Sequence, residues 1–457
     1  MSGTALGSAG GSAGLGDPGR LTQAHGFGGQ ADLPIPLDLA VTGAVAALVV
    51  SFTVLAVAWR RPRYETGERG RAAPQWLDDV VSARWFAIAL RVVGMVLFGY
   101  ALVTAMFGRD SLINPFLGIF YVWLWVGLVP MSLLFGSFWR AISPVRTLHA
   151  LLARATRTDP DHGLFTYPER LGHWPAAFGL LAFVWLELVY PFPTSLGSVR
   201  LWCAVYLAAM LVGGLLFGSR FFRYADPFEV YSTLVGHLSV WRRREGRLWI
   251  SSPLANLATV PPTAGLIGVV GVLFGSTAFD SFGESPGFVG FVQDSAINGQ
   301  LIRNVALLVF CGGAMLVLVV GTMLTGVDGR TPRRSLPDRL AHSIVPIIVG
   351  YVGAHYLTAL LETGSRTLIY ASDPFSLGWN VLGTGGWGYV TWFSYHPELL
   401  ANLKVLMVVL GHVAGAVAAH DRAISILPRR HQLTGQLPLL MAMVVFTAGG
   451  LYLLFAA

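Results

Sequence analysis

Four ionisable side chains lie inside long apolar stretches of the chain: Arg91, Glu187, His355 and His412. Such a group is costly in a lipid-embedded helix unless it is paired or hydrated, so each is a candidate functional residue. Counted from the predicted cytoplasmic end of each span at ~1.5 Å per residue, all four lie ~10–16 Å deep in a ~30 Å apolar core. They belong to four different helices, so only a helical bundle can bring them together. The sequence therefore predicts an intramembrane polar site.

His355 and His412 form the strongest predicted pair. Their spans follow one another in the chain, so we expect antiparallel packing and imidazoles within ~5 Å of the same depth. With the Glu187 carboxylate they could bind a divalent metal ion, relay protons or act as an acid–base pair. Two facing histidines could also ligate haem iron. For each histidine the alternative is a buried imidazole that hydrogen-bonds a neighbouring helix.

Glu187 needs a proton, a partner or water at its predicted depth. Arg91 is its natural counter-ion if the second and fourth spans touch. The pair would then be either a structural brace or, with Glu187 as a site carboxylate, part of the catalytic group.

A second set of polar residues is expected at the outer surface. Asp280, Glu362, Asp373 and Lys404 would form an outer vestibule suited to a cation or a polar substrate. His25 lies outside as well, in the Gly-rich N-terminal segment. Asp373 precedes a proline and is also a good helix cap.

Composition places these residues in a membrane protein. Of 457 residues, 54% are hydrophobic and 12% are charged, and the mean hydropathy is +0.61. We therefore expect an all-α, polytopic transmembrane bundle in the plasma membrane, with the lipid bilayer as its main partner. The net charge of +7 comes from arginines between the spans, so it does not indicate a nucleic-acid partner.

Ten spans can be drawn, and the arginines between them decide the topology. Twenty-four arginines fall in loops on one side and four on the other, which predicts that both termini lie outside. Residues 1–35, rich in Gly, Ser and Ala, are predicted to be a disordered extracytoplasmic tail, and 36–457 form the membrane domain. The predicted spans are 36–59, 84–107, 116–139, 176–194, 201–219, 261–281, 304–325, 343–362, 400–420 and 437–456.

A short internal repeat follows the third and fifth spans. Residues 133–144 and 215–227 share the pattern Leu-Leu-Phe-Gly-Ser, aromatic residues, an arginine, and then a capping residue before proline. Each copy predicts a helix start, at Ser143 and at Asp226. Amphipathic cytoplasmic helices are expected near 144–156 and 227–240. Either a duplicated unit or convergent anchoring at the interface explains the repeat.

Several motifs together resemble a bacterial family of multi-pass membrane proteins labelled fenitrothion hydrolase. The resemblance covers about residues 24–430. It rests on the segments 24–29, 32–37, 185–191, 279–280, 372–375, 411–413 and 419–422.

This resemblance implies hydrolysis of an organophosphorus triester. Glu187, His355 and His412 would activate water, with or without a divalent metal, and Arg91 would stabilise negative charge. The alternatives are a transporter or permease for a metal ion or small solute, and a haem- or copper-containing redox subunit. No GxxxxGK[ST] loop and no HExxH motif is present. The native substrate and any partner subunit cannot be read from the sequence.

Overall fold

The chain folds into a bundle of apolar helices in a computed structural model that describes residues 33, 35–64, 70–325, 331–428, 432 and 434–456. Within this part, eight helices are long and apolar enough to cross a membrane. They are α1 (Leu37–Ala58), α3 (Arg84–Phe107), α9 (Leu196–Phe217), α13 (Leu266–Gly283), α15 (Gly299–Met323), the continuous Arg333–Tyr370, α19 (Pro397–Ile426) and Thr434–Phe455, which contains all but the last residue of α20 (Leu437–Ala456).

The structure supports the predicted class of helical membrane protein. It contains eight or nine candidate spans in its described part, where the sequence predicted ten. A ninth span is a bent pair, Pro115–Val126 and Leu128–Phe135, which meet at 43°. It consists of α4 (Pro115–Gly118), η2 (Ile119–Val126) and α5 (Leu128–Phe135). The predicted span 176–194 is a shorter helix, α8 (Trp174–Leu188), which ends before Pro191 and Pro193. Proline lacks the amide donor that would continue the helix.

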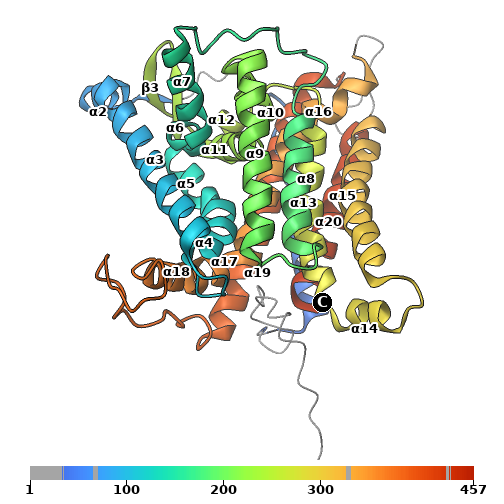
Figure 1. Cartoon of the computed structure of the whole chain (residues 1–457). Helices are drawn as coiled ribbons and strands as arrows, with labels where there is room; N and C mark the ends of the chain where they lie inside the picture. Colours follow the sequence, from blue (N-terminus) through green and yellow to red (C-terminus); the bar gives the residue numbers. More distant parts are fainter. Residues whose placement is uncertain are drawn as a thin grey trace, which may run out of the picture.

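The shorter elements gather at the two ends of the bundle (Figure 1). One end carries α2 (Gln75–Ser82), α7 (Pro144–Thr156) and the strand β3 (Arg247–Ile250), and we call it the arginine-rich end because α7 and β3 contain arginines. The opposite end carries α14 (Pro286–Asp294) and α18 (Gly364–Tyr370). The start of α1 and the C-terminus lie together at this opposite end. The remaining short helices are α6 (Phe138–Ile142), α10 (Arg220–Ala225), α11 (Pro227–Gly236), α12 (Pro253–Leu257), η3 (Arg333–Ser335), α16 (Leu336–Leu340), η4 (Ala341–Ile344), α17 (Val345–Thr358), η5 (Ala359–Thr363) and η7 (Thr434–Gln436).

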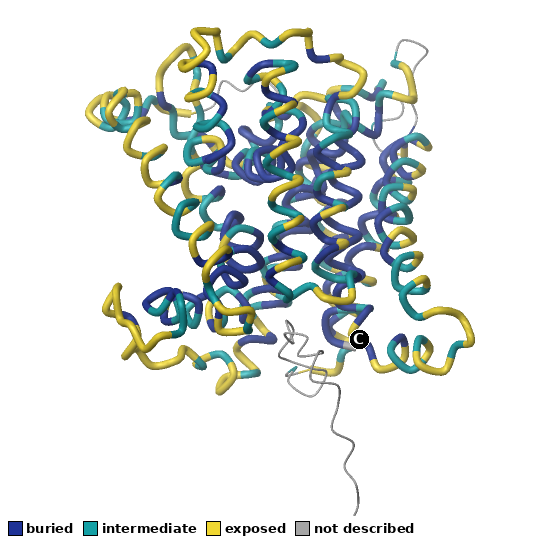
Figure 2. Tube along the Cα trace, viewed as in Figure 1, coloured by how far each residue is buried: buried dark blue, intermediate teal, exposed yellow. Residues whose placement is uncertain are grey.

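Helix α13 lies at the centre of the bundle, and nearly all of its residues are buried, whereas α3 is mostly exposed at the edge (Figure 2). The glycines of α13 permit close packing on α15. A Cβ atom on Gly275 would lie 2.5 Å from the Cα atom of Cys311. Helices α17 and α19 cross in the same way, because a Cβ atom on Gly411 would lie 2.6 Å from the Pro346 carbonyl oxygen. Small residues of this kind let helix backbones approach closely in membranes.

The two repeat copies adopt matching local structures. Gly136 and Gly218 both have positive φ, 81° and 68°, at the end of a helix. The Ser143 side chain then caps α7, and the Asp226 side chain caps α11. The copies differ in burial, because α7 is half exposed whereas α11 is buried against α5, α6 and α8. The expected interfacial helix near 227–240 is therefore an interior helix.

Asp226 is fully buried where the repeat copies meet. Its carboxylate accepts hydrogen bonds from the Trp139 indole N–H at 3.1 Å and the Tyr206 hydroxyl at 3.0 Å. Burial, and secondarily the charge of Glu229, raises the pKa of Asp226 to about 7.

A small sheet was missed by the all-α prediction. Strands β1 (Arg71–Ala72), β3 (Arg247–Ile250) and β2 (Trp241–Arg244) pair antiparallel in that order. Glu245 and Gly246 join β2 to β3 with φ angles of 51° and 80°. Two central residues with positive φ are typical of a tight β-hairpin turn.

Candidate functional site

A buried contact between a histidine and an aspartate joins α13 to α17. The His355 Nε2 atom lies 2.8 Å from the Asp280 Oδ2 atom, and the Tyr356 hydroxyl donates to the same oxygen at 2.7 Å. The side chains of His355 and Asp280 are 6% and 4% exposed, so the pair is shielded from solvent. Two donors on one oxygen are the arrangement that stabilises a buried carboxylate.

The hydrogen-bonded chain continues beyond the imidazole. The Ser281 hydroxyl lies 3.2 Å from the His355 Nδ1 atom and 3.2 Å from the Tyr351 hydroxyl. With Asp280 ionised, a neutral imidazole donates from Nε2, and its Nδ1 atom accepts from Ser281. We call these five residues, Asp280, Ser281, Tyr351, His355 and Tyr356, the buried network.

Two buried polar atoms beside the network lack partners. The Glu187 Oε2 atom and the Tyr231 hydroxyl form no hydrogen bond within the described part of the chain. Glu187 lies within electrostatic range of Asp280, Tyr231 and Tyr356, so the two orphaned atoms border the buried network. An unpaired polar atom in an apolar interior is unfavourable, and a proton, a water molecule or a polar ligand relieves it.

The site lies closer to one end of the bundle than the sequence suggested. Glu187 is the penultimate residue of α8, and Asp280 is the fourth residue from the end of α13. The predicted mid-span depth of Glu187 is therefore wrong, because α8 ends at Leu188. Asp280 was assigned to an outer vestibule, and it instead belongs to the buried network.

His355 and His412 do not share a site. Helices α17 and α19 do pack together, as expected. However, His412 Nδ1 pairs with the Val408 carbonyl oxygen at 2.8 Å, and its buried Nε2 atom has no hydrogen-bond partner in the described chain. His355 uses both ring nitrogens in the buried network, so neither is available to haem iron. Among the described residues, no group of three or more His, Cys, Asp or Glu side chains could hold a metal ion. The expected metal site of His355, His412 and Glu187 is therefore not assembled.

Arg91 is not the counter-ion of Glu187. It is exposed on α3, which packs mainly on α6 and α7, whereas α8 packs mainly on α13 and α11. The second and fourth predicted spans therefore place these side chains in different parts of the bundle. Arg91 instead lines a pocket at the arginine-rich end together with Arg140 and Arg146.

The other residues expected in an outer vestibule are dispersed. Glu362 is buried and accepts hydrogen bonds from the Ser394 amide at 3.1 Å and hydroxyl at 2.8 Å. Lys404 is fully buried in α19. Asp373 lines an open pocket, and His25 lies outside the described residues.

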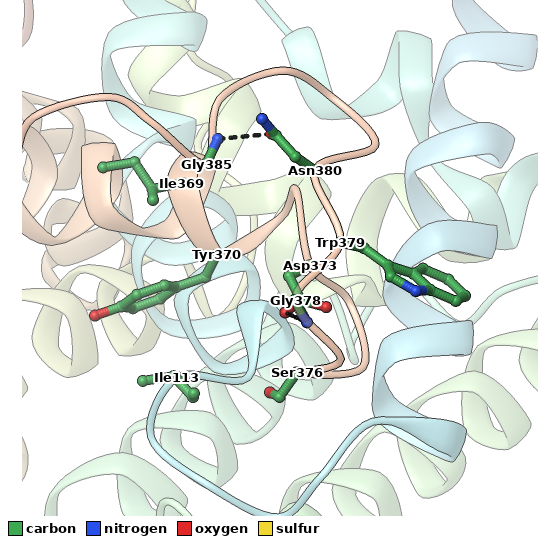
Figure 3. A pocket seen from close by; sticks show the side chains of 9 residues that line it. All are labelled: Ile113, Ile369, Tyr370, Asp373, Ser376, Gly378, Trp379, Asn380 and Gly385. Carbon is green, nitrogen blue, oxygen red and sulfur yellow. Dashed lines mark hydrogen bonds between the residues drawn. The ribbon is translucent and has the colours of Figure 1, made fainter.

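The Asp373 pocket is formed by the loop after α18 and has a volume of about 400 Å³ (Figure 3). The Asp373 carboxylate accepts from the amides of Leu377 and Gly378 at 2.9 and 2.7 Å. These backbone hydrogen bonds lower the pKa of Asp373. The carboxylate therefore holds a turn, and because no helix begins at Asp373, the predicted helix cap is wrong.

Irregular helical segments pack together near this loop. The widened helices η2 and η5 are in contact, and the Trp123 indole N–H donates to the Gly364 carbonyl oxygen at 3.2 Å. η5 directly follows α17, which carries His355. Widened helical turns of this kind are frequent at functional sites.

Four site residues escaped the sequence analysis: Ser281, Tyr351, Tyr356 and Tyr231. Hydroxyl side chains are common in apolar helices, so none of them stands out alone. Tyr351 and His355 are four residues apart, which places them on one helix face and is the signal that was available.

Comparisons with protein-family models, curated proteins and solved structures give no match.

Proposed function

We propose that the protein is a membrane transporter that couples proton binding at the buried network to movement of a small polar solute. The observation that carries this proposal is the pair of orphaned atoms, Glu187 Oε2 and Tyr231 hydroxyl, beside the bonded Asp280–His355 pair. Ionisable residues inside a helical bundle are typical of substrate and proton pathways.

The network can take up a proton through rotation of hydroxyl groups alone. A proton added to His355 occupies Nδ1, which then donates to Ser281 instead of accepting from it. Ser281 turns its own hydrogen toward Tyr351, and Asp280 keeps its bond from Nε2. The contact between His355 Nε2 and Asp280 Oδ2, 2.8 Å long, is kept in both arrangements.

The helix breaks favour transport as the use of this site. The 43° bend between η2 and α5 and the widened η5 interrupt two spans, and η2 contacts η5. Discontinuous helices form the binding sites of many secondary transporters, because freed backbone groups can bind solute and interrupted helices can change their angle.

The test uses the full chain in proteoliposomes on a solid-supported membrane. Amino acids, sugars, organic acids and cations are applied one at a time at two pH values. We expect a pH-dependent current for at least one solute, reduced about ten-fold or more in Glu187→Gln and Asp280→Asn. Asp294→Asn is the control, because Asp294 is exposed in α14 at the same end of the bundle. Currents that persist in both site variants would refute the proposal.

A second candidate is the hydrolase that the family resemblance implies. The row Ser281–His355–Asp280 supports it, because a hydroxyl, a base and a carboxylate that orients the base are the parts of a nucleophilic site. Ser281 Oγ would attack phosphorus, its proton would pass to His355 Nδ1, and the alcohol would leave with that proton. Water deprotonated by the same nitrogen would then attack phosphorus and break the bond to Ser281 Oγ, which takes the proton back.

Hydrolysis and transport can be separated in detergent solution. Hydrolysis predicts turnover of an organophosphorus triester without a membrane, and a phosphorylated Ser281 peptide detectable by mass spectrometry. The Ser281→Ala variant would lose both signals. Solute currents with no turnover and no labelled Ser281 would exclude this second function.

A further inference from the structure

A second polar pocket lies at the arginine-rich end, remote in sequence from the buried network. It has a volume of about 300 Å³ and is formed by α3, α6, α7, the loop at 160–161 and the junction of α9 with α10. Three guanidinium groups line it, those of Arg91, Arg140 and Arg146. The pocket lies where the two repeat copies face each other, with Ser143 from one and Ser219 from the other.

Two of these guanidinium groups are available to a ligand. Arg91 and Arg140 form no hydrogen bond or ion pair within the described part of the chain. Burial, and secondarily the charge of Arg146, lowers the pKa of Arg140, so an anion in the pocket would relieve repulsion between the two.

The third guanidinium group is held in place. Arg146 makes two hydrogen bonds to the Glu229 carboxylate, one of them 2.7 Å long. This ion pair links the third residues of α7 and α11 and fixes Arg146 at the pocket wall. Asp161 also lines the pocket, where it accepts a hydrogen bond from Ser219. Three arginines still outnumber the two carboxylates that face them.

The start of α7 adds to the positive potential. Ser143, Arg146 and Thr147 line the pocket and belong to the cap and first turn of this 13-residue helix. The N-terminal end of a helix carries a partial positive charge that favours anions. His149 is buried, and burial lowers its pKa, so it supplies a polar wall without charge at neutral pH.

The pocket lies toward the start of α3, at the arginine-rich end of the bundle. Arg91 is the eighth residue of α3, roughly 10 Å along the axis from its start at ~1.5 Å per residue. Gly94, one turn further, packs directly on Ile142 of α6, which holds Arg91 beside the α7 start. Because α3 is exposed along most of its length, the pocket borders the surface that faces lipid.

We infer that this pocket binds a phosphate group, carried either by an anionic lipid headgroup or by a soluble phosphate ester. Planar guanidinium groups match phosphate oxygens two at a time, and arginine clusters with a helix N-terminus are a common way to bind them. The pocket is separate from the proposed transport site, so it would anchor a lipid or sense a metabolite.

The test compares two probes on the purified full chain. Phosphatidylglycerol is added in detergent and followed by native mass spectrometry, and glycerol 3-phosphate is titrated and followed by thermal shift. The variants are Arg91→Gln and Arg140→Gln. Arg84→Gln is the matched control, because Arg84 is exposed on the same helix and does not line the pocket.

We expect at least one probe to bind the wild type and Arg84→Gln with equal affinity. Its affinity for each pocket variant should be lower by about ten-fold or more. If the lipid binds and the soluble ester does not, the pocket is a headgroup site. If the soluble ester binds, the pocket is a metabolite site. The inference is overturned if neither probe binds the wild type, or if both pocket variants bind as the wild type does. Size-exclusion profiles and melting temperatures of the variants show whether each is folded.

Discussion

Replacing Asp280 tests the buried network most directly. In Asp280→Ala, the His355 Nε2–H group and the Tyr356 hydroxyl lose their shared acceptor in a solvent-free interior. A buried donor left without an acceptor costs about 1–3 kcal/mol, and here two donors are left unpaired. Asp280→Asn can place its amide oxygen where Oδ2 lies and retain both hydrogen bonds. It loses the charge and exchanges the other carboxylate oxygen for an NH2 donor, which together should cost about 1–2 kcal/mol.

The assay is unfolding of the purified protein by sodium dodecyl sulfate in mixed micelles, followed by tryptophan fluorescence. The free energy of unfolding should fall in the order wild type, Asp280→Asn, Asp280→Ala. Asp294→Ala, an exposed change at the same end of the bundle, should stay within about 0.5 kcal/mol of the wild type. If Asp280→Ala also stayed within that range, the buried network described above would not exist, and the proposed function would lose its basis.

Three further predictions follow from the packing and the charges. Gly411→Ala should destabilise the chain by about 1–3 kcal/mol in the same unfolding assay, because the new methyl group would overlap the Pro346 carbonyl oxygen. Gly449→Ala, with nothing within 4 Å, should instead be neutral or stabilising, and equal losses in both would contradict this reading. The pKa of Asp226 is raised to about 7 by burial, so the native state binds more protons than the unfolded state from about pH 4 to pH 7. The stability of the protein should therefore fall as the pH rises through that window. Between pH 5 and 8 the melting temperature should depend less on pH in Asp226→Asn than in the wild type, and parallel curves would refute the assignment. Finally, His412→Ala should leave the pH dependence of solute currents unchanged, because His412 is bonded only to its own helix, whereas loss of that dependence would place it in the proton path.

Local features of this protein follow from the sequence because each depends on residues close together in the chain. The apolar spans follow from composition, since about 20 apolar residues satisfy both the length and the solvent requirement of a bilayer. The caps at Ser143 and Asp226 follow from a capping residue before proline.

Which side chains meet was decided by the tertiary structure alone. Asp280 and His355 are 75 residues apart, and their contact depends on how α13 and α17 are rotated and crossed. A helical period shows which residues share a face, but it does not show which other helix that face meets, and in an apolar bundle many pairings bury similar surface. Arg91 and Glu187 therefore looked like partners by depth, although α3 packs on α6 and α7 while α8 packs on α13 and α11. Glycines permit close approaches between particular helices, and prolines end helices at particular positions. Together they select one of the possible helix pairings, and this pairing forms both the buried network and the arginine pocket.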